Sequence, residues 1–117
     1  MRFEIENKDD GVILHLEDKI IGDGATQLKN IFEELIDSGI RWIIIDLADV
    51  PLMDSSAIGS IIMAYLKIKE RNGKLVLLYA QKSILDVLNI TKLNTLFEIY
   101  DNMQTALKAI ESISQNS

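Results

Sequence analysis

The spacing of hydrophobic and polar residues changes several times along the chain, and each change separates two predicted elements. Residues 3–6 alternate between apolar and polar, which predicts a half-buried edge strand, and residues 12–17 form a second strand. Asp10-Gly11, at the end of the intervening polar cluster, favours a tight hairpin turn. The first two strands are therefore predicted to pair antiparallel.

Two later segments are apolar without alternation, which is typical of strands covered on both faces of a parallel sheet. They are residues 42–47 and 74–80. The segment between them, residues 56–70, has helical spacing and is followed by the turn dipeptide Asn72-Gly73. This order predicts a βαβ unit, whose crossover is nearly always right-handed.

The first helix is predicted to begin at Asp23 as its N-cap and to end at Gly39. Its apolar residues repeat at helical spacing and form one face: Leu28, Ile31, Phe32, Leu35 and Ile36. Three elements complete the chain: a short helix at 83–88, a short strand at 96–100, and a last helix capped by Asp101 or Asn102.

These elements predict an α/β fold in a single domain over residues 1–117. The expected architecture is a mixed sheet of about five strands with about four helices. Residues 114–117 are predicted to be a frayed tail.

Composition narrows the classes of partner. The net charge of −6, from 12 basic and 18 acidic residues, argues against nucleic acid and anionic membrane surfaces. The absence of cysteine excludes disulfides, thiol nucleophiles and thiolate metal sites. No signal peptide is recognisable, and no apolar run approaches the roughly 20 residues of a membrane span. We therefore expect a cytoplasmic protein without membrane insertion.

The helix at 56–70 is apolar almost all round in its first two turns. A helix on one face of a sheet needs an apolar stripe only about 100° wide, which Ile58, Ile62 and Met63 exceed. Either neighbouring helices cover the excess, or the helix start is exposed and binds a protein partner. We expect a monomer, although the same surface could form a weak dimer contact.

Asp54-Ser55-Ser56 lies where a buried strand turns into this helix, a common location of binding sites in parallel sheets. One interpretation is an ordinary helix cap. The other is a phosphoacceptor serine, because a phosphate would meet the positive end of the helix dipole. It would add about two negative charges beside Asp54 and would act mainly on a docking partner.

Other chemistry has little support in the sequence. A serine nucleophile needs a positioned base, and the single histidine, His15, lies in the second predicted strand. The chain has neither a Gly-x-Ser-x-Gly elbow nor a phosphate-binding Walker loop. Asp9-Asp10 lies in a hairpin turn, which does not suit a receiver-type acidic site. We therefore predict no enzymatic activity, no metal and no cofactor.

The chain resembles the STAS domain family of bacterial anti-sigma factor antagonists. The family motif Asp-Ser-Ser/Thr-Gly-Leu-Gly is matched by residues 54–59, with Ala57 and Ile58 in place of glycine and leucine. The family's earlier Asp-x-x-Thr is matched by residues 23–26. The turn at residues 72–73 and the order of strands and helices also agree.

This resemblance implies a phosphorylation switch. An unphosphorylated antagonist binds an anti-sigma factor that is also a serine kinase, and the kinase then phosphorylates the residue matching Ser55 and releases it. A serine phosphatase resets the switch, and Asp23 matches the docking loop. The predicted partner-binding residues are Asp23, Thr26, Asp54, Ser55, Ser56, Ala57, Ile58, Gly59 and Ile62.

Two alternatives remain open. The domain could serve another complex, as a transporter accessory subunit or a signalling scaffold. It could also be a sensor that binds a small ligand or nucleotide in the crevice near Ser55.

Overall fold

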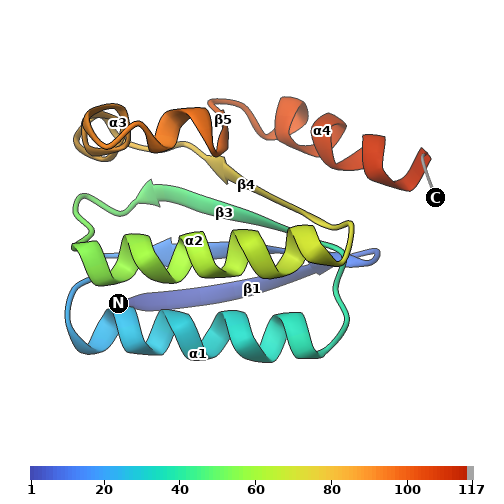
Figure 1. Ribbon diagram of the computed structural model, residues 1–117, viewed down its shortest axis with the longest axis horizontal. Coiled ribbons are helices and arrows are strands. Elements are labelled where there is room, and N and C mark those ends of the chain that lie inside the picture. Colours follow the sequence, from blue (N-terminus) through green and yellow to red (C-terminus); the bar gives the residue numbers. More distant parts are fainter. Residues whose placement is uncertain (116–117) are drawn as a thin grey trace.

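A five-stranded mixed sheet forms the centre of the structure, a computed structural model that describes residues 1–115 (Figure 1). The elements are β1 (Arg2–Lys8), β2 (Gly11–Glu17), α1 (Asp23–Asp37), β3 (Trp42–Asp49), α2 (Ser55–Glu70), β4 (Lys74–Leu78), α3 (Lys82–Ile90), the 3-10 turn η1 (Leu93–Thr95), β5 (Glu98–Tyr100) and α4 (Met103–Gln115). The strands are arranged in chain order. β1 pairs antiparallel with β2, and the other neighbours are parallel. The predicted fold class and the predicted hairpin are confirmed.

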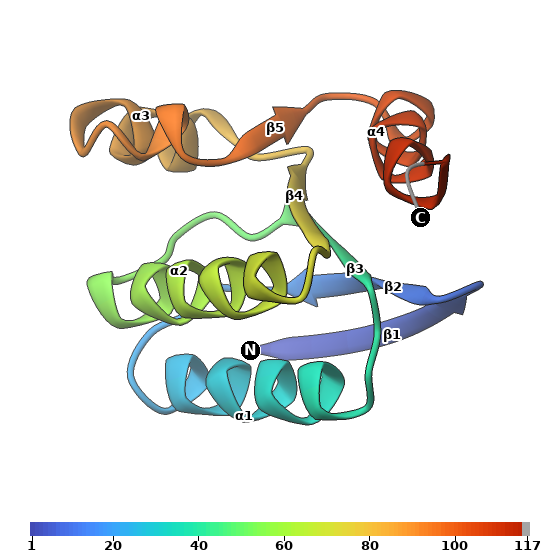
Figure 2. The same cartoon turned by 45° about the vertical axis from the view of Figure 1, so that its right-hand side comes forward.

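Both faces of the central strands are covered, as their unbroken apolar sequences predicted. Alternate residues of β3, including Ile43 and Ile45, belong to the larger core cluster with α1, α2 and α3. Trp42 and Ile44 point to the opposite face, where they pack with Ala106 of α4. Figure 2 shows α1 and α2 beside each other on one side of the sheet.

The helix ends show which caps depend on local sequence. Gly39 follows α1 with φ 89°, as predicted. After α2, Asn72 has φ 60°, and Gly73 donates its N–H to Ile68 O at 2.9 Å, which forms a Schellman motif. The prediction that Asp23 caps α1 is wrong. Gly22 occupies the cap position with φ 53°, and Asp23 is the first helical residue.

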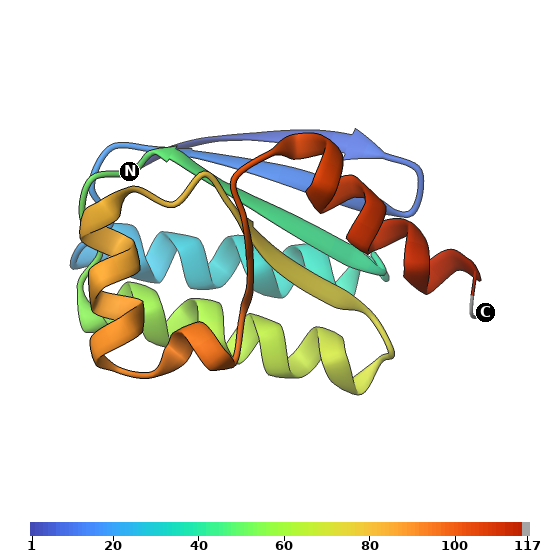
Figure 3. The ribbon, with the colours of Figure 1, turned by 90° about the horizontal axis from the view of Figure 1, so that it is seen from above.

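β4 is shorter than predicted. It ends at Leu78 rather than at residue 80, because Tyr79 has φ 58°, a left-handed conformation that breaks the strand. α3, which follows, begins at Lys82. The turn brings α3 to the end of the molecule where α1 and α2 begin, whereas α4 lies at the opposite end (Figure 3).

Of the two caps considered for α4, the structure selects Asn102, whose Oδ1 accepts the Thr105 N–H at 3.1 Å. α4 continues to Gln115, so Ser114 and Gln115 of the predicted frayed tail are helical. Residues 116–117 lie outside the described part of the chain. Within residues 1–115, no helix has the length and apolar character needed to cross a membrane.

Candidate functional site

The loops before α1 and α2 are joined side by side beyond the ends of β2 and β3. Ile20 N–H donates to Leu52 O at 2.9 Å, and Asp54 N–H donates to Ile20 O at 3.1 Å. Ile20 and Met53, both buried, form an isolated parallel bridge. These bonds extend the sheet pairing past the strands. They place the first turns of α1 and α2 next to each other at one end of the molecule (Figure 1).

Asp54 uses both carboxylate oxygens to hold this arrangement. Oδ1 accepts the Ala57 N–H at 2.9 Å and caps α2, while Oδ2 accepts the Gly22 N–H at 2.9 Å. These bonds, led by the one from Gly22, hold the pKa of the Asp54 carboxyl below its ordinary value of 3.8. The predicted cap is therefore present. Asp54 also explains why Gly22 rather than Asp23 is the N-cap of α1, since the bond that the Gly22 N–H donates to Asp54 in the neighbouring loop fixes Gly22.

This geometry predicts a pH-dependent cost for replacing Asp54. Because the pKa of Asp54 is lowered by folding, its contribution to stability is present above about pH 4 and is lost as the carboxyl protonates below that value. Urea unfolding should show that Asp54→Ala is less stable than the parent at about pH 7 and that the difference shrinks towards about pH 3. Asp54→Asn should lose less stability than Asp54→Ala, because its amide oxygen can still accept the Ala57 bond that caps α2. It should stay less stable than the parent, because its NH₂ group cannot accept the Gly22 bond. A deficit that is equal at both pH values would contradict the assigned role.

Ser55 and Ser56 are exposed at the start of α2, where Ser55 is the first helical residue. Neither hydroxyl makes a hydrogen bond to another group within residues 1–115. The backbone around them is fixed by Asp54, so the hydroxyls are free on a rigid support. Chemically, this arrangement presents a hydroxyl at the positive end of a helix dipole.

The other predicted partner-binding residues differ in their accessibility. Asp23 and Thr26, on the first turn of α1, are exposed, while Ile58, Gly59 and Ile62 are half-buried. Ala57 is completely buried in the core beneath α2, so its side chain cannot contact a partner. We therefore remove Ala57 from the candidate surface.

The apolar excess on α2 is largely covered. Ile58, Ile62 and Tyr65 pack against the larger core, and Tyr65 makes an edge-to-face contact with Phe97 at 5.4 Å between ring centroids. Met63 and Leu66 are the large residues of this helix that stay open to solvent, with 53% and 44% of their surface exposed. Neighbouring elements thus account for most of the excess, and the exposed remainder includes Met63.

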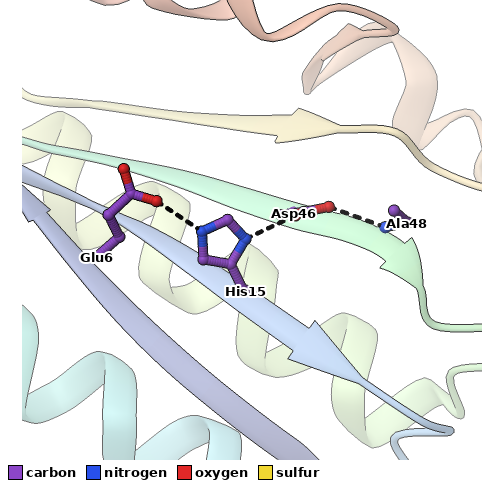
Figure 4. A network of polar contacts seen from close by, with 4 residues as sticks. All are labelled: Glu6, His15, Asp46 and Ala48. Atoms are coloured by element: carbon purple, nitrogen blue, oxygen red, sulfur yellow. Dashed lines mark hydrogen bonds and ion pairs between the residues drawn. The ribbon is translucent and has the colours of Figure 1, made fainter.

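A charged network on the other face of the sheet was missed at the sequence level. Imidazole Nδ1 of His15 lies 2.7 Å from Asp46 Oδ2, and Nε2 lies 3.0 Å from Glu6 Oε1 (Figure 4). Asp46 Oδ1 also accepts the Ala48 N–H at 3.0 Å, near the end of β3. Both partners of His15 are carboxylates, so only the doubly protonated ring can donate to both. The register of β2 on β3 would have been needed to predict this network, because His15 and Asp46 are paired across these parallel strands.

The His15 network gives a second pH prediction. Burial lowers the pKa of His15, but the hydrogen bonds and charges of Glu6 and Asp46 outweigh it and raise the pKa above 6.5. The stabilisation is therefore complete below about pH 6.5 and is lost as the pH rises through the folded-state pKa. The unfolding free energy of the parent, relative to His15→Gln, should fall between about pH 6 and about pH 9. An NMR titration that places the His15 pKa at or below 6.5 would contradict the network.

The surroundings of the acidic residues and of His15 bear on two kinds of chemistry considered for the sequence. Within residues 1–115, no group of three or more His, Asp or Glu side chains is arranged to hold a metal ion. The His15 ring is engaged by Glu6 and Asp46 on the face opposite α1 and α2, so it is not positioned as a base for Ser55.

Comparison with known proteins assigns the fold. A model of the STAS domain matches residues 2–106. The chain belongs to the STAS domain family. A curated relative from Thermotoga maritima, provisionally named an anti-sigma factor antagonist, is 28% identical over 103 residues, which cover 87% of this chain and 91% of that protein.

Solved structures agree with this assignment. A crystal structure of a provisionally named anti-sigma factor antagonist from Thermotoga maritima matches with a TM-score of 0.88 at 27% identity, covering 93% of this chain and 94% of that one. The antagonist SpoIIAA in its unphosphorylated form matches with a TM-score of 0.83 at 18% identity, covering 95% and 97%. Its phosphorylated form from Bacillus gives 0.75 at 18% identity, covering 93% and 99%. SpoIIAA thus shares the STAS fold with this chain.

The STAS framework explains how this chain tolerates its departures from the family motif. Ala57, at the motif's glycine position, is helical, does not have a positive φ and donates its N–H to Asp54. Its methyl group is buried in the core. The position therefore does not require the conformational freedom of glycine here. Ile58, at the leucine position, also packs against the core.

Proposed function

We propose that this STAS domain is an anti-sigma factor antagonist whose binding is switched by phosphorylation of Ser55. The observation that carries the proposal is the exposed, unbonded Ser55 hydroxyl at the first position of α2, beside the exposed start of α1. Relatives named as anti-sigma factor antagonists support the regulatory role. SpoIIAA, a protein of the same fold, has been solved with and without phosphorylation.

In the proposed cycle, the unphosphorylated domain binds an anti-sigma factor that is also a serine kinase. The kinase supplies ATP and magnesium, and this chain supplies the acceptor hydroxyl. Ser55 Oγ forms a bond to the γ-phosphorus, the bond to the β–γ bridging oxygen breaks, ADP leaves, and the hydroxyl proton passes to a base of the kinase. A serine phosphatase hydrolyses the phosphate and restores the starting state. This chain is the substrate and the switch, not the catalyst.

The structure suggests why the phosphate would act on the partner more than on the fold. Ser55 is exposed, and negative charge at a helix start is favourable to the helix. The phosphate would add about two negative charges next to Asp54, whose lowered pKa keeps it ionised, and near the exposed Asp23. A partner that fits this acidic edge while Ser55 is unphosphorylated would lose both shape and charge complementarity once the phosphate is added.

Charge reversal at Asp23 tests whether the starts of both helices form the docking surface. Asp23→Lys should weaken binding to a serine-kinase anti-sigma factor of the same organism by about tenfold, measured by isothermal titration calorimetry. Asp37→Lys, an exposed charge reversal at the opposite end of the same helix, is the matched control and should bind like the parent. If Asp23→Lys and Asp37→Lys have equal affinities, the start of α1 is not part of the interface.

A further inference from the structure

A groove with a volume of about 340 Å³ lies between α1 and α2, apart from the Ser55 hydroxyl. Phe32 and Ile36 form its apolar wall on α1, and Met63 and Ala64 form the wall on α2. The volume falls within the range of small-molecule sites, which are mostly apolar with a few polar groups. The groove therefore has the size and lining of a ligand site.

Small residues on α2 create this space. Gly59 faces the groove, and a Cβ atom built on it would meet no other atom within 4 Å. Ser60 also lines the groove, and its hydroxyl can donate to Ser56 O at 3.1 Å or to Ala25 O of α1 at 3.3 Å. Glycine inside a helix is less favourable than alanine, so an open glycine here does not serve the stability of α2.

The charges around the groove have the opposite sign to the chain as a whole. Lys29 lines it from α1 and Lys67 from α2, against a single lining acid, Glu33. Neither lysine forms an ion pair within residues 1–115, although the net charge of the chain is −6.

We propose that the α1–α2 groove binds a small amphiphile, with an apolar chain along Phe32 and Met63 and one anionic head held by Lys29 and Lys67. A carboxylate on a medium-length alkyl chain has this chemistry. Burial of the chain supplies most of the affinity, and the two ammonium groups select for an anion. Ser56 and Gly59 belong to both the groove lining and the predicted docking surface, but Ser55 does not line the groove, and decanoate binding is measured without a kinase, so either proposal can fail without the other.

Sodium decanoate is the probe, titrated into the ¹⁵N-labelled chain and followed by amide shifts in α1 and α2. Gly59→Leu fills the open side of the groove and should weaken decanoate binding at least tenfold. Asn30→Leu places the same side chain at an exposed position of α1 that does not line the groove, so it should bind decanoate like the parent. Equal affinity of parent and Gly59→Leu, with both variants folded, would overturn the proposal, as would shifts confined to α4.

The charge requirement is tested separately. Lys29→Gln combined with Lys67→Gln should reduce decanoate affinity several-fold, whereas Lys108→Gln on the exposed face of α4 should leave it unchanged. Decanol, which has the same chain without the charge, should bind the parent more weakly than decanoate. Equal binding of decanol and decanoate would contradict the anionic head and leave an apolar chain site as the correct description.

Discussion

Ser55→Asp is expected to weaken the complex with the anti-sigma factor by about 10- to 100-fold while leaving the melting temperature unchanged or slightly raised. The two effects have different causes. In the complex, a carboxylate beside Asp54 introduces repulsion and a desolvated charge at the interface. In the free domain, Ser55 is exposed at the first position of α2, where a negative charge interacts favourably with the helix dipole.

Calorimetric binding and a thermal melt of the same samples separate these effects. Thr105→Asp introduces the same charge at an exposed position in the first turn of α4, which packs on the face of the sheet opposite α2, and should bind like the parent. A drop of several degrees in the melting temperature of Ser55→Asp would favour a purely structural role for the turn. Unchanged affinity would remove Ser55 from the docking surface.

Gly11→Ala should destabilise the domain by about 1–3 kcal/mol, the usual cost of overpacking, or more if the hairpin cannot shift. A Cβ atom at Gly11 would lie 2.1 Å from atoms Cδ2 and Cε2 of the Trp42 ring. The ring is a poor candidate for displacement, because it is buried and its Nε1 donates to Asp10 Oδ1 at 2.9 Å. The hairpin turn and the first residue of β3 are therefore packed directly on each other.

Urea unfolding measures this effect. Gly24→Ala is the matched control, because its Cβ would approach Met1 Cβ at an ordinary 3.4 Å and the residue lies in the first turn of α1. The control should be neutral or more stable, since alanine is the better helix former. A Gly11→Ala domain as stable as the parent would mean that the Trp42 packing is not rigid.

Features that depend on neighbouring residues were predictable from the sequence. The apolar run of β3 indicated a strand covered on both faces, because every second side chain points to each face. Gly39 and the Asn72-Gly73 pair marked helix ends, because a left-handed residue is required there whatever the fold. The Asp54 cap was also local, since its Oδ1 bonds within three residues.

Features set by tertiary contacts were not predictable in the same way. The start of α1 was misplaced by one residue because Gly22 is fixed by Asp54, 32 positions away. The burial of Ala57 depends on how α2 packs on the sheet. The spacing of apolar residues predicts only which face of the helix is buried. The contact of His15 with Asp46 needed the register of β2 on β3, and the α1–α2 groove needed the spacing of two helices.

Phosphotransfer is the most direct test of the Ser55 switch. The parent, Ser55→Ala and Ser56→Ala are incubated with the serine-kinase anti-sigma factor, ATP and magnesium, and intact mass is measured over time. The switch predicts that the parent and Ser56→Ala each gain one phosphate and that Ser55→Ala gains none. Phosphorylation of Ser55→Ala to the same extent as the parent would contradict Ser55 as the acceptor.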